Sequence, residues 1–265
     1  MLRDFEQLRA IFWDAVRRHV RGRRFAALLA FVLLDAALII GLYLSGALAK
    51  PSTGVEFAQA YLGLNSALLF VIGPALGGDI LSDLSSRPGL FLLTQPVRRR
   101  TILSGRLLAA FAIGSVIVAA YYLACVAGLR ILGLPVPASI LASFALALLL
   151  LTAVVGVAVL FGSVFRNGST AIAATVLVLV VGSFGTQSFL EQASVEPWFL
   201  LTYATRVLTA VLPPSYPPHS QEVVQRGGFV LTFVPYLWEG VVLMIMYLLV
   251  SIVSAFVVFA RREVA

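Results

Sequence analysis

The segment from Asp79 to Arg106 holds most of the residues whose types and spacing suggest a specific interaction. It carries two acids four residues apart, a Pro-Gly turn, the apolar block Leu90 to Leu93 and an arginine triplet, all between two long apolar stretches. Burying one large apolar side chain stabilises a protein by about 1.5–3 kcal/mol, so four exposed ones are unfavourable in water. The segment is therefore predicted either to rest on lipid headgroups or to dock into a partner protein.

The rest of the sequence offers little to enzyme chemistry. The nucleotide-binding motif G-x-x-x-x-G-K-[ST] does not occur, and neither do G-x-S-x-G or H-E-x-x-H. His19 and His219 are expected on opposite sides of a membrane, where they cannot share a metal ion, and each is interpreted as a surface histidine. The single Cys125 excludes a multi-cysteine metal site. No catalytic, cofactor-binding or metal-binding residue is predicted in this chain.

The composition is that of an integral membrane protein. Apolar residues make up 60% of the sequence and charged residues 12%, whereas soluble domains carry about 25% charged residues. The net charge of +7 raises the question of a nucleic-acid partner. Because the arginines stand at the ends of apolar stretches, they are better explained as flanks of membrane spans, and no nucleic-acid partner is expected.

The hydropathy pattern predicts an all-α membrane protein with six transmembrane helices. Residues 1–24 are expected to form a cytoplasmic amphipathic helix on the membrane surface. The transmembrane domain, residues 25–265, follows, with a cytoplasmic loop at 79–106 and the largest opposite loop at 191–233. That larger loop is predicted to contain a re-entrant helical hairpin, because its apolar part is too short to cross and a proline-rich turn follows. The spans are expected at about 25–49, 57–78, 107–129, 138–165, 171–190 and 234–260.

The distribution of basic residues predicts the orientation. With both termini on one side, that side holds fifteen of the nineteen basic residues, and the other holds Lys50, Arg130, Arg206 and Arg226. Basic residues are enriched in cytoplasmic loops, so both termini and the 79–106 loop are expected in the cytoplasm. The expected location is the plasma membrane.

A few polar residues lie inside the predicted spans. Asp35 falls near the middle of the bilayer, where a carboxylate costs about 2.5–3.5 kcal/mol, so it is expected to face protein or water. Two interpretations stay open: it lines a substrate path or subunit interface together with Asn65, or it is protonated and bonded to a neighbouring helix. Asn65 and Gln187 also suit interhelical hydrogen bonds, and Gly41-x3-Ser45 offers a weak signal for close helix packing.

The order of residues in the 79–106 loop resembles the first cytoplasmic loop of ABC transporter permeases of the type-2 exporter class. In that family the loop contains an acid, Gly-Thr, a leucine-rich block, Thr-Pro-Val-Ser-Arg and Leu-x-Gly-Lys. This sequence departs from it by Asp in place of Glu, by Arg-Pro before the glycine and by an inserted Gln95. The matching positions are Asp79 or Asp83, Gly89, Leu90 to Leu93, Thr94, Pro96, Val97, Arg98, Leu103, Gly105 and Arg106.

The resemblance implies a permease subunit that moves an unidentified substrate. It would pair with a second copy or a paralogue, sit in the lipid bilayer and use ATP bound and hydrolysed by a separate ABC ATPase subunit. The alternative is a non-transporting membrane scaffold or assembly factor that docks a cytoplasmic partner through the same loop. The residues that would couple to the ATPase are Asp79, Asp83, Arg87, Gly89, Leu90, Phe91, Leu92, Leu93, Pro96 and Arg98.

Overall fold

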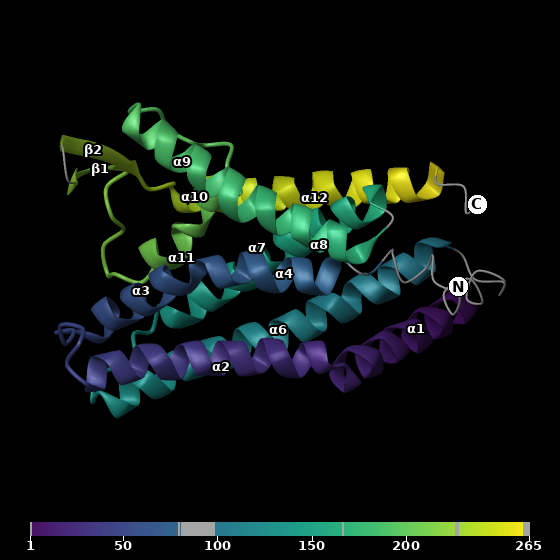
Figure 1. Ribbon diagram of the computed structural model, residues 1–265, viewed down its shortest axis with the longest axis horizontal. Helices are drawn as coiled ribbons and strands as arrows, with labels where there is room; N and C mark the ends of the chain where they lie inside the picture. Colours follow the sequence, from purple (N-terminus) through teal and green to yellow (C-terminus); the bar gives the residue numbers. More distant parts are fainter. Residues whose placement is uncertain (1, 79, 81–98, 166, 226–227, 262–265) are drawn as a thin grey trace.

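The structure, a computed structural model, describes residues 2–78, 80, 99–165, 167–225 and 228–261, and they are mostly helical (Figure 1). Helix α1 (Leu2–Arg21) carries most of the N-terminal arginines and is separated from α2 (Arg23–Leu44) by Gly22. The start of α1 and the end of α12 (Leu237–Arg261) lie at the same end of the molecule (Figure 1). This end is called the basic end below.

The chain runs back and forth between the basic end and the opposite end (Figure 1). After α2, it returns through α3 (Gly54–Asn65), a 3-10 turn at Ser66–Leu68 and α4 (Leu69–Gly77). The long helices α6 (Arg99–Ile131) and α7 (Ile140–Val164) follow. Then come α8 (Gly168–Val176), a π-helical segment (Leu177–Gly182) and α9 (Ser183–Gln192), which together form one continuous passage.

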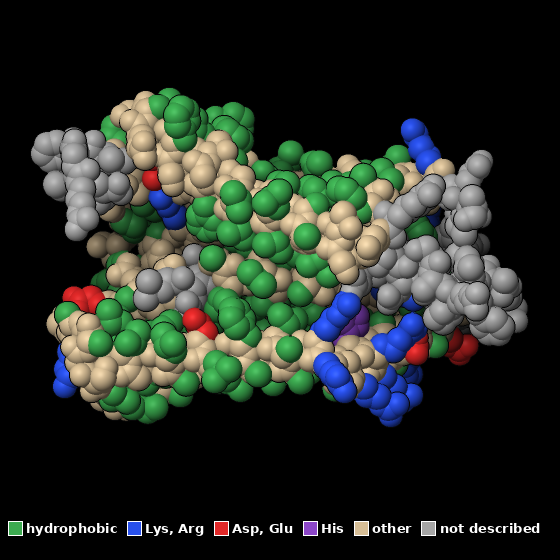
Figure 2. All heavy atoms as spheres, viewed as in Figure 1, with side chains coloured by type: hydrophobic (Ala, Val, Ile, Leu, Met, Phe, Trp, Pro, Cys, Tyr) green, Lys and Arg blue, Asp and Glu red, His purple; other side chains and the backbone are tan. Residues whose placement is uncertain are grey.

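Five of these passages are long and apolar enough to cross a membrane. They are Arg23–Leu44, Arg100–Ile131, Ile140–Val164, Gly168–Gln192 and Leu237–Phe259. The predicted second span corresponds to α3, the 3-10 turn and α4, so its helix is interrupted midway and is not one of the five. Apolar side chains cover much of the face between the two ends, and Lys and Arg gather at the basic end (Figure 2).

Helix α7 forms the centre of the bundle. It packs against α12, α4, α6 and α8, and an unbroken run of its residues, 153–159, is buried. Glycines allow the closest of these contacts: a Cβ added to Gly77 would lie 2.8 Å from Ala158 Cβ and 2.9 Å from Val155 O. Because those neighbours are backbone and a short side chain, they cannot move aside cheaply, which fixes the α4–α7 distance.

Stacked and edge-on aromatic rings connect four helices near the opposite end. Tyr61 of α3 stacks on Tyr121 of α6 with ring centroids 4.9 Å apart, and the hydroxyl of Tyr121 donates to the carbonyl of Tyr61 (3.1 Å). The series begins at Tyr43 of α2 and ends at Phe144 of α7. Such pairs add about 0.5–1.5 kcal/mol each beyond their burial, so this layer stabilises the bundle.

Helix α2 ends at Leu44, five residues before the predicted end of the first span at residue 49. Gly46 adopts a positive φ of 78°, and the N–H of Leu48 reaches back to the carbonyl of Leu42. A glycine in the left-handed region just past the last turn is a common helix stop. The apolar residues that follow therefore continue as a turn.

The connection between α9 and α12 differs from the predicted helical hairpin. It contains two short helices, α10 (Leu201–Thr205) and α11 (Val207–Ala210), which account for the helical part of the expectation. The return is instead an antiparallel pair of strands, β1 (Ser220–Gln225) and β2 (Gly228–Phe233), with Ser220 opposite Phe233 and Gln225 opposite Gly228. The sequence after the proline-rich turn favours strands over a helix, because it contains the β-branched and aromatic residues Val223, Val224, Phe229 and Val230.

Candidate functional site

At the basic end, α1 lies directly against the start of α6. Gly105 makes this contact possible, because a Cβ there would come within 2.8 Å of Ile11 Cγ2 and 3.3 Å of the Leu8 carbonyl. Leu103, two residues earlier, is 1% exposed. Gly105 of the Leu-x-Gly-Arg sequence that ends the 79–106 loop thus lets the amphipathic helix pack on the bundle, and Leu103 of the same sequence is buried.

Arg106 links the two flanks of that loop. Its side chain is 5% exposed, and its Nη1 donates a hydrogen bond to the carbonyl oxygen of Ile80 (2.8 Å). Ile80 follows the end of α4, and Arg106 lies in the second turn of α6. A charged donor bonded to a backbone carbonyl in a buried place is worth about 1.5–3 kcal/mol. The bond therefore holds the beginning and the end of the loop together.

A cavity of about 420 Å³ opens beside this bond, between α1, α2 and the end of α4. Its basic lining consists of the arginines Arg18, Arg23, Arg24 and Arg106 together with the ring of His19. Arg18 forms an ion pair with Asp14, and His19 Nδ1 lies 3.0 Å from the Ala15 carbonyl, so part of the lining is already engaged. The cavity is positively charged and favours anionic groups near the loop.

The residues predicted to couple to an ATPase lie outside the described part of the chain. This holds for all ten, Asp79, Asp83, Arg87, Gly89, Leu90, Phe91, Leu92, Leu93, Pro96 and Arg98. What the structure does place is the pair of anchors around them, Ile80 and Arg106. The docking role of the loop stays a prediction.

Asp35 lies in α2 next to the face that packs on the bundle, where Val32 and Ala36 are buried. Its side chain is partly exposed, but Oδ2 is enclosed and has no hydrogen-bond partner among the described residues. An enclosed carboxylate oxygen without a partner is unfavourable. Asn65, the other predicted pathway residue, ends α3 just before the 3-10 turn, and the structure does not describe its side chain.

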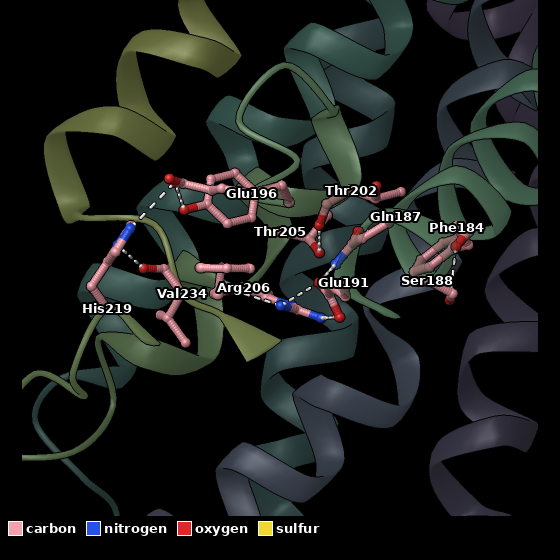
Figure 3. A network of polar contacts seen from close by, with 12 residues as sticks. Phe184, Gln187, Ser188, Glu191, Glu196, Thr202, Thr205, Arg206, His219 and Val234 are labelled. Carbon is pink, nitrogen blue, oxygen red and sulfur yellow. Dashed lines mark hydrogen bonds and ion pairs between the residues drawn. The ribbon is translucent and has the colours of Figure 1, made fainter. Parts of the chain in front are cut away.

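At the opposite end, a polar network joins α9 to the segment before α12 (Figure 3). Arg206, between α10 and α11, contacts both carboxylate oxygens of Glu191: Nη1 lies 2.7 Å from Oε1, and Nη2 donates to Oε2 at 3.0 Å. Arg206 Nη1 also donates to the Phe233 carbonyl at the end of β2 (2.5 Å), and Gln187 Nε2 donates to Glu191 Oε1 (3.0 Å). A two-point arginine–carboxylate pair fixes orientation as well as charge.

Three residues of this network, Gln187, Glu191 and Arg206, also line a pocket of about 250 Å³. Two polar atoms are enclosed there and make no hydrogen bond to any residue that the structure describes, namely Gln187 Oε1 and Thr202 Oγ1. Both residues are buried, at 5% and 1% exposed. Buried polar atoms are nearly always hydrogen-bonded, to water where protein offers no partner. The pocket is therefore suited to hold water or a small polar group.

A second cluster lies beside this network. Tyr203 donates its hydroxyl to Glu196 Oε1 (2.6 Å), and His219 Nε2 lies 3.4 Å from the same oxygen (Figure 3). Burial, reinforced by the hydrogen bond to Glu196, raises the pKa of Tyr203 above its ordinary value, so the phenol stays protonated and acts as a donor. Glu239 of α12 also approaches Glu196 and His219.

Sequence reasoning did not identify these two clusters as sites. Arg206 in the middle of an apolar segment was the available signal for the first, because a charge there needs a partner. For the second there was little signal, since Glu196, His219 and Glu239 are far apart in the sequence and come together only through the fold of the 193–236 connection.

The bundle of apolar helices, with α1 packed beside α6 at the basic end, defines a polytopic membrane protein. The family model described as ABC-2 family transporter protein matches residues 9–264, so the chain belongs to this family. It is a membrane transport component of the ABC-2 permease class, as its resemblance to type-2 exporter permeases implies. No curated protein matches the chain significantly.

Proposed function

We propose that this chain is the membrane-spanning subunit of an ABC exporter, driven by ATP hydrolysed on a separate subunit. The observation that carries the proposal is the family match over residues 9–264. The chain itself contains no G-x-x-x-x-G-K-[ST] sequence, so the nucleotide must be bound elsewhere in the complex.

In this proposal the chain crosses the membrane six times. The five long apolar helices supply five crossings, and the interrupted passage of α3, the 3-10 turn and α4 supplies the sixth. An even number of crossings agrees with the start of α1 and the end of α12 lying at one end (Figure 1). That end carries most of the basic residues, and it faces the cytoplasm by the positive-inside rule.

The 79–106 loop is the docking element for the ATPase. Its ends are anchored by the Arg106–Ile80 hydrogen bond and by the contact of Gly105 with α1. A displacement of the docked loop would therefore act on α4, α6 and α1 together, and through α4 on the central helix α7. This gives the ATPase a mechanical connection to the bundle without a covalent link.

A complete pathway requires a second permease copy or a paralogue. Many apolar side chains of α2 and α12 are exposed, such as Leu34, Leu38 and Val250, and these helices face either lipid or that second subunit. Asp35 is proposed to point into a protein-lined or water-lined region of the assembled pair, because Oδ2 finds no partner among the described residues.

The test is co-expression with a candidate ATPase subunit, followed by purification in lipid nanodiscs. We expect a stable complex whose ATP hydrolysis rises at least severalfold over that of the isolated ATPase. A complex whose hydrolysis does not depend on this chain would instead support a scaffold or assembly factor. If no candidate ABC ATPase subunit binds the chain, the proposal is contradicted.

A further inference from the structure

Glu196, His219 and Glu239 each bring one metal-ligating atom into a small volume at the end opposite the basic end. The three atoms lie within 4.8 Å of one another. Glu196 belongs to the stretch after α9, His219 directly precedes β1, and Glu239 lies in the first turn of α12. Three separate parts of the chain therefore meet at this point.

The tautomer of His219 follows from its surroundings. Nδ1 lies 2.9 Å from the carbonyl oxygen of Val234, and a carbonyl oxygen can only accept, so Nδ1 carries a proton. In the neutral ring Nε2 then bears a lone pair, and it faces Glu196 Oε1 at 3.4 Å (Figure 3). A lone pair turned toward a carboxylate is repulsive unless a proton or a metal cation lies between them.

The ring is also held in place. The N–H of Val234 donates to the His219 carbonyl (2.7 Å), so the residues are joined through backbone and side chain. The imidazole stacks on Tyr236 with centroids 4.8 Å apart and planes 4° from parallel. Nε2 is thus pointed toward the carboxylates before any ligand arrives, which lowers the cost of binding.

Each of the two carboxylates has a supporting hydrogen bond. Tyr203 donates to Glu196 Oε1 (2.6 Å), and the N–H of Tyr236 donates to Glu239 Oε2 (2.9 Å). A carboxylate has about four acceptor positions, so both retain capacity for a cation. Metal-binding histidines typically donate the other ring N–H to a carbonyl or carboxylate, and ligating carboxylates are themselves hydrogen-bonded. All three residues follow this arrangement.

We propose that Glu196, His219 and Glu239 bind a divalent cation of the zinc class, with His219 bound through Nε2. Zinc takes histidine nitrogen and carboxylate oxygen at about 2.0–2.2 Å, which separates tetrahedral ligands by about 3.3 Å. The 3.4 Å between His219 Nε2 and Glu196 Oε1 has this value, and Glu239 closes the site by a small side-chain movement. Two carboxylates balance the charge of the cation, and a fourth position remains for water or another ligand.

The cation would fasten the 193–236 connection onto the first turn of α12. His219 and Val234 tie the beginning of β1 to the segment after β2, and Glu239 belongs to α12. The proposal does not depend on transport or on an ATPase partner. It replaces the expectation from sequence that no metal is bound, which weighed a multi-cysteine site, the H-E-x-x-H motif and a site shared by the two histidines, and did not weigh one histidine with carboxylates from separate segments.

The test uses the full chain purified with a tag that lacks histidine, freed of metal by chelation and titrated with zinc chloride by calorimetry. We expect one zinc per chain with micromolar or tighter affinity and a higher thermal midpoint in zinc. His219→Ala and Glu196→Gln should weaken binding at least tenfold, and Tyr203→Phe, which removes a supporting donor, about tenfold. His19→Ala is the matched control, because it removes the other histidine at the far end, and it should bind as the wild type does.

Two results would overturn the proposal. One is equal zinc uptake by the wild type and His219→Ala, which places the cation elsewhere. The other is no uptake by a folded wild-type chain at millimolar zinc, which leaves His219 as an imidazolium between the two carboxylates. Circular dichroism of each variant, together with unchanged elution as a single species, separates loss of binding from loss of fold.

Discussion

Glu191 and Arg206 form a two-point ion pair that joins α9 to the α10–α11 segment, with nitrogen–oxygen distances of 2.7 and 3.0 Å. The Glu191 side chain is 9% exposed and that of Arg206 26%. The guanidinium also holds the end of β2 through the Phe233 carbonyl. One arginine therefore connects three parts of the polar network, and its removal leaves a buried carboxylate without its charge partner.

Replacing Arg206 with Met tests this connection. We expect the free energy of unfolding to fall by about 2–4 kcal/mol, because the Glu191 carboxylate stays buried without a positive partner. Arg206 is itself only partly exposed, so its hydrogen bonds are not simply replaced by water. The measurement is thermal or denaturant unfolding in one detergent. Arg130→Met, at an exposed arginine at the end of α6, is the control and should change stability by less than about 0.5 kcal/mol.

The double variant Glu191→Gln with Arg206→Met checks the mechanism. Removing both charges leaves no uncompensated ion, so the double variant should lose less stability than the sum of the two single variants. Additive losses would show that the pair contributes nothing as a pair.

Gly77→Ala tests the close approach of α4 and α7. The added Cβ meets Ala158 Cβ at 2.8 Å and the Val155 carbonyl at 2.9 Å, so the helices must separate. We expect a loss of about 1–3 kcal/mol. Gly185→Ala in α9 is the matched control, since a Cβ there has nothing within 4 Å, and it should be neutral or slightly stabilising. Equal effects of the two substitutions would refute the packing argument.

Asp35→Leu tests the enclosed carboxylate in α2. Because Oδ2 has no hydrogen-bond partner among the described residues, the acid costs stability in the single chain. We expect the variant to insert normally and to unfold at a higher temperature than the wild type. A lower midpoint would show that Asp35 makes a stabilising contact, whereas a higher midpoint with lost ATPase stimulation would assign it to the transport pathway.

Cysteine labelling tests the orientation of the chain in cells. On a Cys125→Ala background, Ser215→Cys marks the exposed proline-rich turn, and Ser169→Cys marks an exposed position in the first turn of α8 at the basic end. We expect a membrane-impermeant maleimide added outside to label position 215 and to spare position 169. The reverse pattern would mean that the basic end faces outward.

The sequence predicted the helical class and the positions of five apolar passages because long apolar runs bounded by arginines are strong signals. Local backbone effects changed the detail: Gly46 ended α2 early, and strand propensity after the prolines produced β1 and β2 in place of a helical return. These outcomes depend on a few residues, whose influence a hydropathy pattern averages out.

Helix packing was harder to predict. Gly41-x3-Ser45 has the spacing of a packing motif, yet a Cβ at Gly41 would have nothing within 4 Å, whereas Gly77 and Gly105 sit at close contacts. Small residues are frequent in apolar helices, so their spacing does not tell which ones face a neighbour. The clusters around Glu191 and His219 were also not predicted: Arg206 in an apolar segment was a signal for the first, but both depend on how a long connection folds back.

The central claim is that the 79–106 loop couples this permease to a separate ATPase, and replacing Phe91 and Leu92 with Asp tests it most directly. The control exchanges the two residues, Phe91→Leu with Leu92→Phe, and so keeps the apolar block. Both variants should insert normally, because neither position belongs to a described or predicted span.

The decisive measurement is the affinity of each variant for the ATPase in nanodiscs, with the rate of ATP hydrolysis recorded on the same samples. Two apolar anchors replaced by carboxylates should weaken binding at least about 100-fold and abolish the stimulated hydrolysis, while the exchanged pair stays near the wild type. If the double Asp variant binds its ATPase with wild-type affinity and turnover, the loop only rests on lipid and the account of coupling is wrong.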